Sequence, residues 1–247
     1  STHCISSAAS DVYKRQTVDT AKSGNLVNWK AGALYRLTEQ GNVYVNYAIS
    51  QQPPGGSSFA LAASGSGNSA NRTDFKPQKA KSSELGTKWQ IFDNRLLLSA
   101  ALFRTDIENE VAANDDGTWS QYGKKRVEGY ELSATGNLTP DWTIIAGYTQ
   151  QHATVTEGQN VAQDGSSALA YTPKHAFTLW TQYQATSDLS VGGGVRYVGS
   201  LRRGSDGAVG TPDHTEGYWV ADAKLGYRVN SCLLYTSDAA DDMQCVD

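Results

Sequence analysis

Few residues of this chain have the types and spacing needed for catalysis or for metal binding. His152, His175 and His214 stand too far apart in the sequence to predict one metal site by spacing. Serine, histidine and aspartate residues all occur, but the sequence contains no Gly-x-Ser-x-Gly motif of the kind that marks a nucleophilic serine. We therefore predict no catalytic residue, no protein-bound metal and no cofactor.

The two ends of the chain differ from its middle in residue usage and in pattern. Residues 1–16 and 231–247 resemble translated sequencing-adapter read-through, so we predict two non-native segments around a folded body, residues 17–230. Cys4, Cys232 and Cys245 all lie in these ends, and the body therefore predicts neither a disulfide framework nor a thiol site.

Charge and hydropathy exclude several classes of protein. The net charge is −4, and without the five acidic and two basic residues of the ends it becomes −1, from 20 acids and 19 bases. This balance gives no support for nucleic-acid binding. The sequence shows no signal peptide, and no apolar run approaches the ~20 residues of a membrane-spanning helix.

The body alternates in polarity with a period of two residues. The odd positions of residues 43–49 and 219–229 are apolar, whereas the even positions are mostly polar or small. A soluble sandwich would hide the apolar positions against a second sheet, while a barrel in lipid presents them outward and keeps the polar positions around a wet lumen. We predict an all-β fold, a partial transmembrane antiparallel β-barrel.

The alternating segments predict about nine strands joined by connections of alternating length. The predicted strands are 25–37, 41–50, 82–92, 95–112, 121–138, 142–154, 174–184, 189–202 and 217–229. Short connections (38–40, 93–94, 139–141, 185–188) alternate with long ones (51–81, 113–120, 155–173, 203–216). In outer-membrane barrels the short turns face the periplasm and the long loops face outside.

Strand length and aromatic content add two expectations. Several strands exceed the ~9–11 residues that cross lipid, so we expect them to project beyond the membrane on the outer side, as in a large barrel. We expect an interfacial girdle from the aromatic residues near the short turns, Tyr35, Phe92, Trp142, Tyr183 and Tyr227.

We expect the following charged residues to face the lumen and to pair across strands: Glu84, Lys88, Glu128, Glu131, Asp222, Lys224 and Arg228.

An ordered series of short sequence segments resembles the barrel of TonB-dependent siderophore receptors, in particular that of the ferric-catecholate branch. The resemblance covers most of residues 82–230. Its strings are Glu84–Trp89, Leu98–Thr105, Arg126–Leu132, Ala146–Thr149, Thr172–His175, Gly192–Gly199 and Gly217–Asp222.

The resemblance implies a 22-stranded barrel filled by an N-terminal plug. The present sequence contains neither a plug nor a TonB box, so we expect a fragment from the later part of such a barrel. The implied function is import of a ferric siderophore across the bacterial outer membrane, with iron present only as the chelated ligand. The implied partners are the TonB complex, outer-membrane lipid and lipopolysaccharide.

A receptor for anionic ferric siderophores needs cationic and aromatic groups at its outer end. The candidates are Arg202, Arg203, Trp119, Tyr122, Lys124, Lys125, Arg126 and Arg72. For each residue alone, the alternative is a side chain that solvates a loop or binds lipopolysaccharide phosphates.

Two other functions stay open from the sequence. A passive porin-type channel would have the same wall but neither a plug nor energy coupling. An outer-membrane barrel enzyme such as a lipase would need a serine and a histidine facing lipid near the outer interface, and we find no convincing pair.

Overall fold

The computed structural model describes residues 25–54, 74–113, 119–158, 160, 162–204, 212–230 and 233–238. These residues form one ten-stranded antiparallel sheet in which β1 to β8, β11 and β12 follow each other in chain order, together with a separate pair, β9 and β10. The strands are β1 (Trp29–Arg36), β2 (Gly41–Gln52), β3 (Gln78–Ile91), β4 (Leu96–Ala113), β5 (Trp119–Thr139), β6 (Trp142–Glu157), β7 (His175–Gln184), β8 (Leu189–Val198), β9 (Leu201–Arg202), β10 (His214–Thr215), β11 (Tyr218–Asn230) and β12 (Leu233–Asp238).

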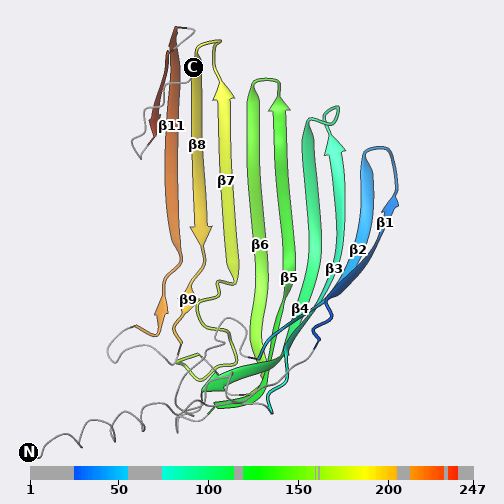
Figure 1. Cartoon of the computed structure of the whole chain (residues 1–247). Helices are drawn as coiled ribbons and strands as arrows, with labels where there is room; N and C mark the ends of the chain where they lie inside the picture. The colour runs from blue at the N-terminus through cyan, green and yellow to red at the C-terminus, as the bar shows by residue number, and fades with distance from the viewer. Residues whose placement is uncertain are drawn as a thin grey trace, which may run out of the picture.

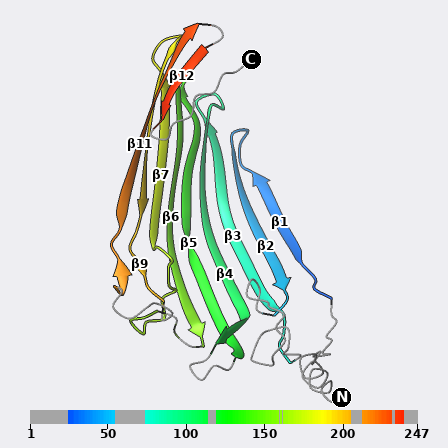
Figure 2. The same cartoon turned by 60° about the vertical axis from the view of Figure 1, so that its left-hand side comes forward.

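The sheet is a curved, open wall. In Figures 1 and 2 the short turns gather at one end of the strands and the long connections at the other. The edge strands β1 and β12 do not pair with each other in the described part of the chain. The predicted partial antiparallel barrel is thus confirmed.

Strand register gathers the apolar residues on one face. Val45 on β2 lies opposite Leu85 on β3, which lies opposite Leu102 on β4, which in turn lies opposite Tyr130 on β5. Directly opposed residues of antiparallel strands share a face. We call this the outward face, and the face that carries Tyr44 the inward face.

Within the part of the chain that the structure describes, the outward face has no second protein layer over it. Leu85, Leu102 and Trp219 are 56%, 59% and 63% exposed. Leaving one large apolar side chain in water costs ~1.5–3 kcal/mol relative to burial. A whole face of such residues would exceed the ~5–15 kcal/mol that stabilises a typical soluble domain. The face is therefore built for lipid.

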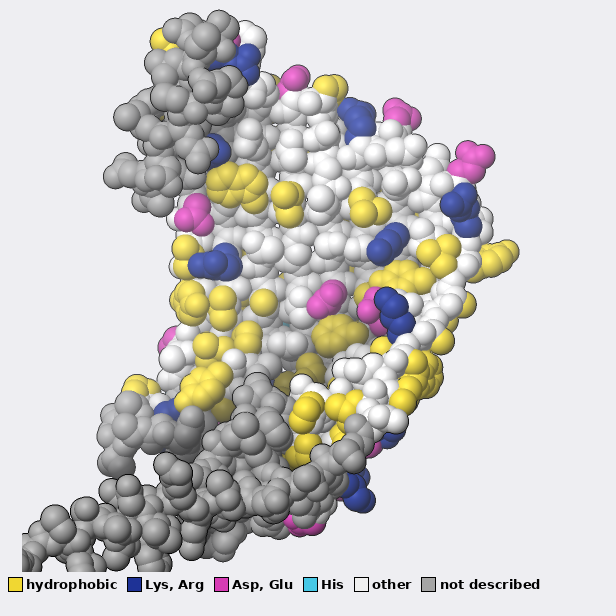
Figure 3. Space-filling model, viewed as in Figure 1, with side chains coloured by type: hydrophobic (Ala, Val, Ile, Leu, Met, Phe, Trp, Pro, Cys, Tyr) yellow, Lys and Arg dark blue, Asp and Glu magenta, His cyan; other side chains and the backbone are white. Residues whose placement is uncertain are grey.

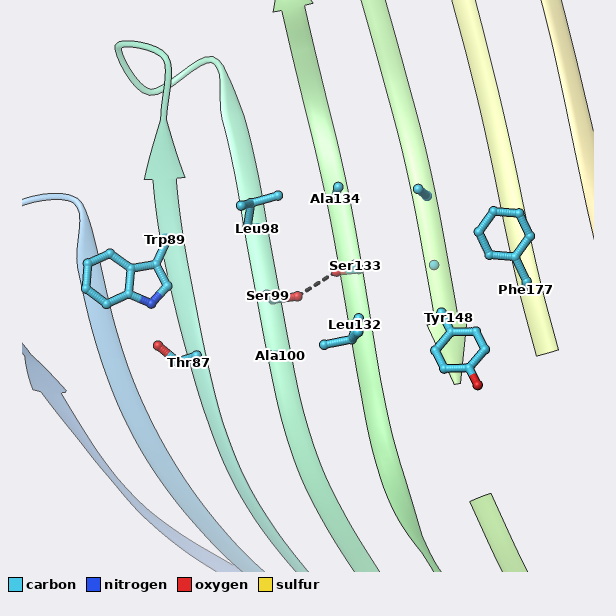
Figure 4. A pocket seen from close by; sticks show the side chains of 12 residues that line it. Thr87, Trp89, Leu98, Ser99, Ala100, Leu132, Ser133, Ala134, Tyr148 and Phe177 are labelled. Atoms are coloured by element: carbon cyan, nitrogen blue, oxygen red, sulfur yellow. Dashed lines mark hydrogen bonds between the residues drawn. The ribbon is translucent and has the colours of Figure 1, made fainter. Parts of the chain in front are cut away.

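Small and large residues alternate on the outward face and leave shallow apolar hollows in it. One hollow of about 410 Å³ spans β3 to β7, between the rings of Trp89, Tyr148 and Phe177 (Figure 4). Behind it, on the inward parity, a hydrogen bond of 2.5 Å between the hydroxyls of Ser99 and Ser133 joins β4 to β5. An uneven apolar surface of this kind suits flexible acyl chains.

The inward face is polar. The Tyr44 hydroxyl donates a hydrogen bond of 2.5 Å to Glu84, and the ammonium of Lys88 lies 5.4 Å from the Tyr44 ring centroid. In Figure 3, scattered Lys, Arg, Asp and Glu side chains are interspersed with single hydrophobic residues, the pattern expected for a face toward a wet lumen.

Two rows of aromatic residues border the apolar band. Near the short turns, register puts Tyr35, Trp142, Tyr183 and Tyr227 on the outward face, as predicted. The other row was not predicted, and it comprises Trp29, Tyr47, Tyr130, Tyr148, Phe177, Tyr197 and Trp219. Trp142 and Tyr148 stand six residues apart on β6, roughly 20 Å along a strand that rises ~3.3 Å per residue. The two rows match the girdles that flank the hydrocarbon region in transmembrane barrels.

Several predicted boundaries need correction. We predicted that residues 231–247 lie outside the folded body and therefore lack stable pairing with it, but Leu233–Asp238 forms β12 and pairs with β11. That expectation was wrong because the free edge of β11 offers unpaired backbone groups to any following segment. Residues 201–202 form β9 instead of extending β8.

Residues 1–16 lie outside the described residues, and the assignment of both ends as non-native stays a prediction. Within the described ranges, no helix is long and apolar enough to cross a membrane.

Gly136 provides a test of this register. Its φ is +138°, and an added Cβ would stand 2.1 Å from the carbonyl oxygen of Arg95, the turn residue that directly precedes the facing strand β4. We expect Gly136→Ala to destabilise a full-length protein that carries this segment, because alanine disfavours this backbone conformation and its Cβ would clash with the Arg95 carbonyl. The measurement is the temperature at which the protein loses the gel mobility of the folded barrel, and we expect this temperature to fall. Gly147→Ala is the control, since its Cβ would meet only Thr178 at 3.5 Å. Equal midpoints for the two variants would contradict this register.

Candidate functional site

Charged residues occupy the outward face beyond the second aromatic row, toward the long connections. Lys81 binds Glu108 at 2.5 Å, Arg126 binds Asp106 at 2.7 Å, and Lys124 binds Glu157 at 2.6 Å. Arg104 also binds Asp106, at 3.0 Å. These pairs form a ladder across β3, β4, β5 and β6. The ladder explains how strands of 18, 21 and 16 residues stay together beyond the apolar band.

The cluster Lys124-Lys125-Arg126 is divided between the two faces. Register places Lys124 opposite Glu108 and Arg126 opposite Asp106, both on the outward face. Lys125 has the opposite parity and binds Glu110 at 2.6 Å. The three cations therefore do not converge on one ligand, and each is already paired with a carboxylate.

Arg202 and Arg203 hold two long connections together. The Arg202 guanidinium binds the Asp164 carboxylate and donates a hydrogen bond of 3.1 Å to the Ser166 hydroxyl. The Arg203 amide donates to the Asp213 carbonyl at 2.7 Å, and its carbonyl accepts from the Gln163 amide at 3.0 Å. Both arginines thus lie where the connection between β6 and β7 meets the one between β9 and β10.

The remaining candidates are less defined. Trp119 and Tyr122 belong to β5, but their side chains lie outside the described residues, as does all of Arg72.

His214 on β10 is a further titratable group at this end. Its ring contacts the Asp213 carboxylate at 2.7 Å and the Glu216 carboxylate at 3.4 Å. The hydrogen bonds that the protonated ring donates to the Asp213 and Glu216 carboxylates raise the pKa of His214 above its ordinary value. The same hydrogen bond lowers the pKa of Asp213. His214 therefore keeps its proton to a higher pH than a free histidine does.

One predicted lumen-facing residue is misplaced. Glu84, Glu131, Lys224 and the other predicted charges share the inward face by register. Glu128, in contrast, lies opposite Arg104 and has the parity of Tyr130, so it is on the outward face. The prediction for Glu128 was wrong because an outward charge is tolerated where a strand extends beyond lipid.

Sequence reasoning missed the carboxylates that neutralise the candidate cations. Asp164 stands 38 residues from Arg202, and Glu157 stands 33 residues from Lys124. Strand register brings the second pair together and the packing of two connections brings the first, so no local motif marks either. Among the described residues, no three or more His, Cys, Asp or Glu side chains gather in a way that could hold a metal ion.

Comparison with known proteins assigns the wall to a family. Residues 6–239 match the family described as "TonB dependent receptor-like, beta-barrel". The chain belongs to this family. It is accordingly part of an outer-membrane barrel, as predicted.

Within this family, the chain is similar to several named siderophore receptors. The chain is 79% identical over 217 residues to the catecholate siderophore receptor Fiu of Escherichia coli O157:H7, covering 88% of the chain and 29% of Fiu. The closed form of Fiu from E. coli K12 superposes with a TM-score of 0.81, at 77% identity, over 89% of this chain and 31% of that structure. The siderophore receptor PiuA from Acinetobacter baumannii superposes with a TM-score of 0.70, at 31% identity, over 84% of this chain and 30% of that structure. The chain thus spans about 29% of the length of its curated relative.

Proposed function

We propose that this chain is a segment of the barrel of a receptor that imports a ferric siderophore of the catecholate class. The observation that carries the proposal is the 79% identity to a receptor named for catecholate siderophores. The same wall superposes with a TM-score of 0.81 on a solved ferric-catecholate receptor.

In this proposal the wall has two tasks. Its outward face anchors the barrel in the outer membrane, between two aromatic rows. Its outer end attracts the anionic ferric ligand through the guanidinium groups of Arg202 and Arg203, because a fixed cation raises the local concentration of an oppositely charged ligand. Iron enters as cargo, already chelated, and the proposal gives the wall neither a resident cofactor nor a catalytic step.

The remaining candidate contacts differ by face. Lys125 has the inward parity and stays a candidate ligand contact. Lys124 and Arg126 have the outward parity, so we propose that they meet the phosphate groups of lipopolysaccharide beside the barrel. Trp119, Tyr122 and Arg72 stay candidates on sequence grounds alone.

Such a receptor would need a partner protein that supplies the energy to move the ferric siderophore across the outer membrane. A ferric siderophore is too large for efficient passive diffusion, and the outer membrane offers no nucleotide supply of its own. We therefore propose the TonB complex as the partner of the whole protein. The porin alternative differs on this point, because a passive channel needs no partner.

The energy requirement separates receptor from porin. The host receptor for this test is E. coli Fiu with its matching segment replaced by this chain. In cells without TonB, we expect the host receptor to bind a radiolabelled ferric catecholate but to accumulate no iron. Cells with TonB and equal receptor abundance are the control. Undiminished iron accumulation without TonB would overturn the receptor proposal and favour a porin.

A pair of variants tests Arg202 as a ligand contact. Arg202→Gln and Asp164→Asn both break the ion pair that ties the two connections together, but only Arg202→Gln removes the cation. If Arg202 contacts the ligand through a charge-assisted hydrogen bond, Arg202→Gln should weaken ferric-catecholate binding by about tenfold, while Asp164→Asn leaves it nearly unchanged. Equal losses in the two variants, measured at equal receptor abundance, would leave Arg202 as a loop tether only.

A further inference from the structure

A partly open hollow, lined by both polar and apolar residues, lies where β6 continues beyond β7. The last residue pair between these strands is Gln150 with His175. Beyond it, the segment 166–174 takes the place of a strand. The Val155 amide donates to the Ser167 carbonyl at 2.6 Å and the Leu169 amide donates to the Ala153 carbonyl at 3.0 Å. Between β6 and this irregular segment the wall leaves a hollow of about 270 Å³.

The lining of this hollow is positively charged and rich in hydroxyl groups. Its lining residues include the basic residues Lys174, Arg202 and His152 and hydroxyl-bearing residues such as Thr154 and Ser167. None of the described lining residues is acidic. The packed elements also carry carboxylates, among them Asp164, which binds Arg202, and Glu128, which lies opposite His152 on β5.

The cations of the hollow keep unused donors. Within the described ranges the Lys174 ammonium has no hydrogen-bond or ion-pair partner, while its carbonyl accepts from the Gln151 amide at 2.9 Å. Arg202 uses Nη1 for both Asp164 and Ser166. Its Nε and Nη2 atoms donate to no described residue. Asp164 and Ser166 thus hold the guanidinium at the hollow without using all of its donors.

We infer that this hollow binds a small oxyanion, a carboxylate or a phosphate, between Lys174 and Arg202. Charge-assisted hydrogen bonds from the two cations would hold the anion, and the hydroxyls of Thr154 and Ser167 would supply further donors. At about 270 Å³ the hollow fits one anionic group or a single arm of a larger ligand, since pockets for whole drug-sized molecules usually measure ~300–1,000 Å³. The assignment does not depend on the proposed function.

The test measures protection of lysine side chains in the purified host receptor. An amine-reactive reagent is applied at increasing inorganic phosphate, with sodium chloride at equal ionic strength as the control, and each lysine is followed by mass spectrometry. We expect phosphate to protect Lys174. Lys76 is the matched control, since it is exposed, lies on a long connection and has no described ion pair. Acetate as a second probe tells whether a carboxylate or a phosphate is preferred.

A conservative variant tests the geometry. Thr154→Val keeps the shape of the side chain but removes one hydroxyl donor, so it should raise the half-protecting concentration about fivefold. Ser82→Ala, on the inward face of β3 and away from the hollow, should leave it unchanged. Protection of Lys174 by either anion, weakened in Thr154→Val, supports the site. Equal protection of Lys174 and Lys76, or no protection by either anion, would overturn it.

Discussion

An apolar sheet face without a second protein layer is the constraint on which the rest of this structure depends. The outward face of β2 to β5 presents Val45, Leu85 and Leu102 side by side, and each is about half exposed or more. Water cannot accommodate such a face, while lipid can, provided that the backbone groups pair within the sheet. Strand pairing and membrane placement are therefore one problem in this protein, because the same register that satisfies the backbone also sorts the side chains.

The residue types on the outward face also change with depth along the strands. Aromatic rings stand at both limits of the apolar band, and charged residues begin beyond the second row. On β5 the order Leu132, Tyr130, Glu128, Arg126 passes from the apolar band through the aromatic row to the ion-pair ladder. This order explains why the longest strands exceed the length needed to cross lipid. Their outer halves are water-exposed extensions held by ion pairs, and they support the connections where the candidate ligand contacts lie.

The sequence alone predicted strands and faces well because period-two alternation is a local signal. It predicted the row at Trp142 and Tyr183, since these residues flank short turns. It did not predict β12, because an edge strand is defined by its neighbour and not by its own pattern. Glu128 was misplaced because a charge was taken as inward, although its strand had already left the lipid. The pair between Arg202 and Asp164 joins residues far apart in sequence, so only the assembled connections could reveal it.

The central claim is that the outward face between the aromatic rows meets lipid. It can be tested by placing single nitroxide labels along β4 of the host receptor in bilayers, with the cysteines of this segment replaced by serine, and by measuring their accessibility to oxygen and to a water-soluble nickel complex. The account predicts high oxygen accessibility at Leu98, Ala100 and Leu102, low oxygen accessibility at Leu97, Ser99 and Ala101, and a change to nickel accessibility at Arg104 and Asp106. An oscillation of opposite phase, or none at all, would contradict it.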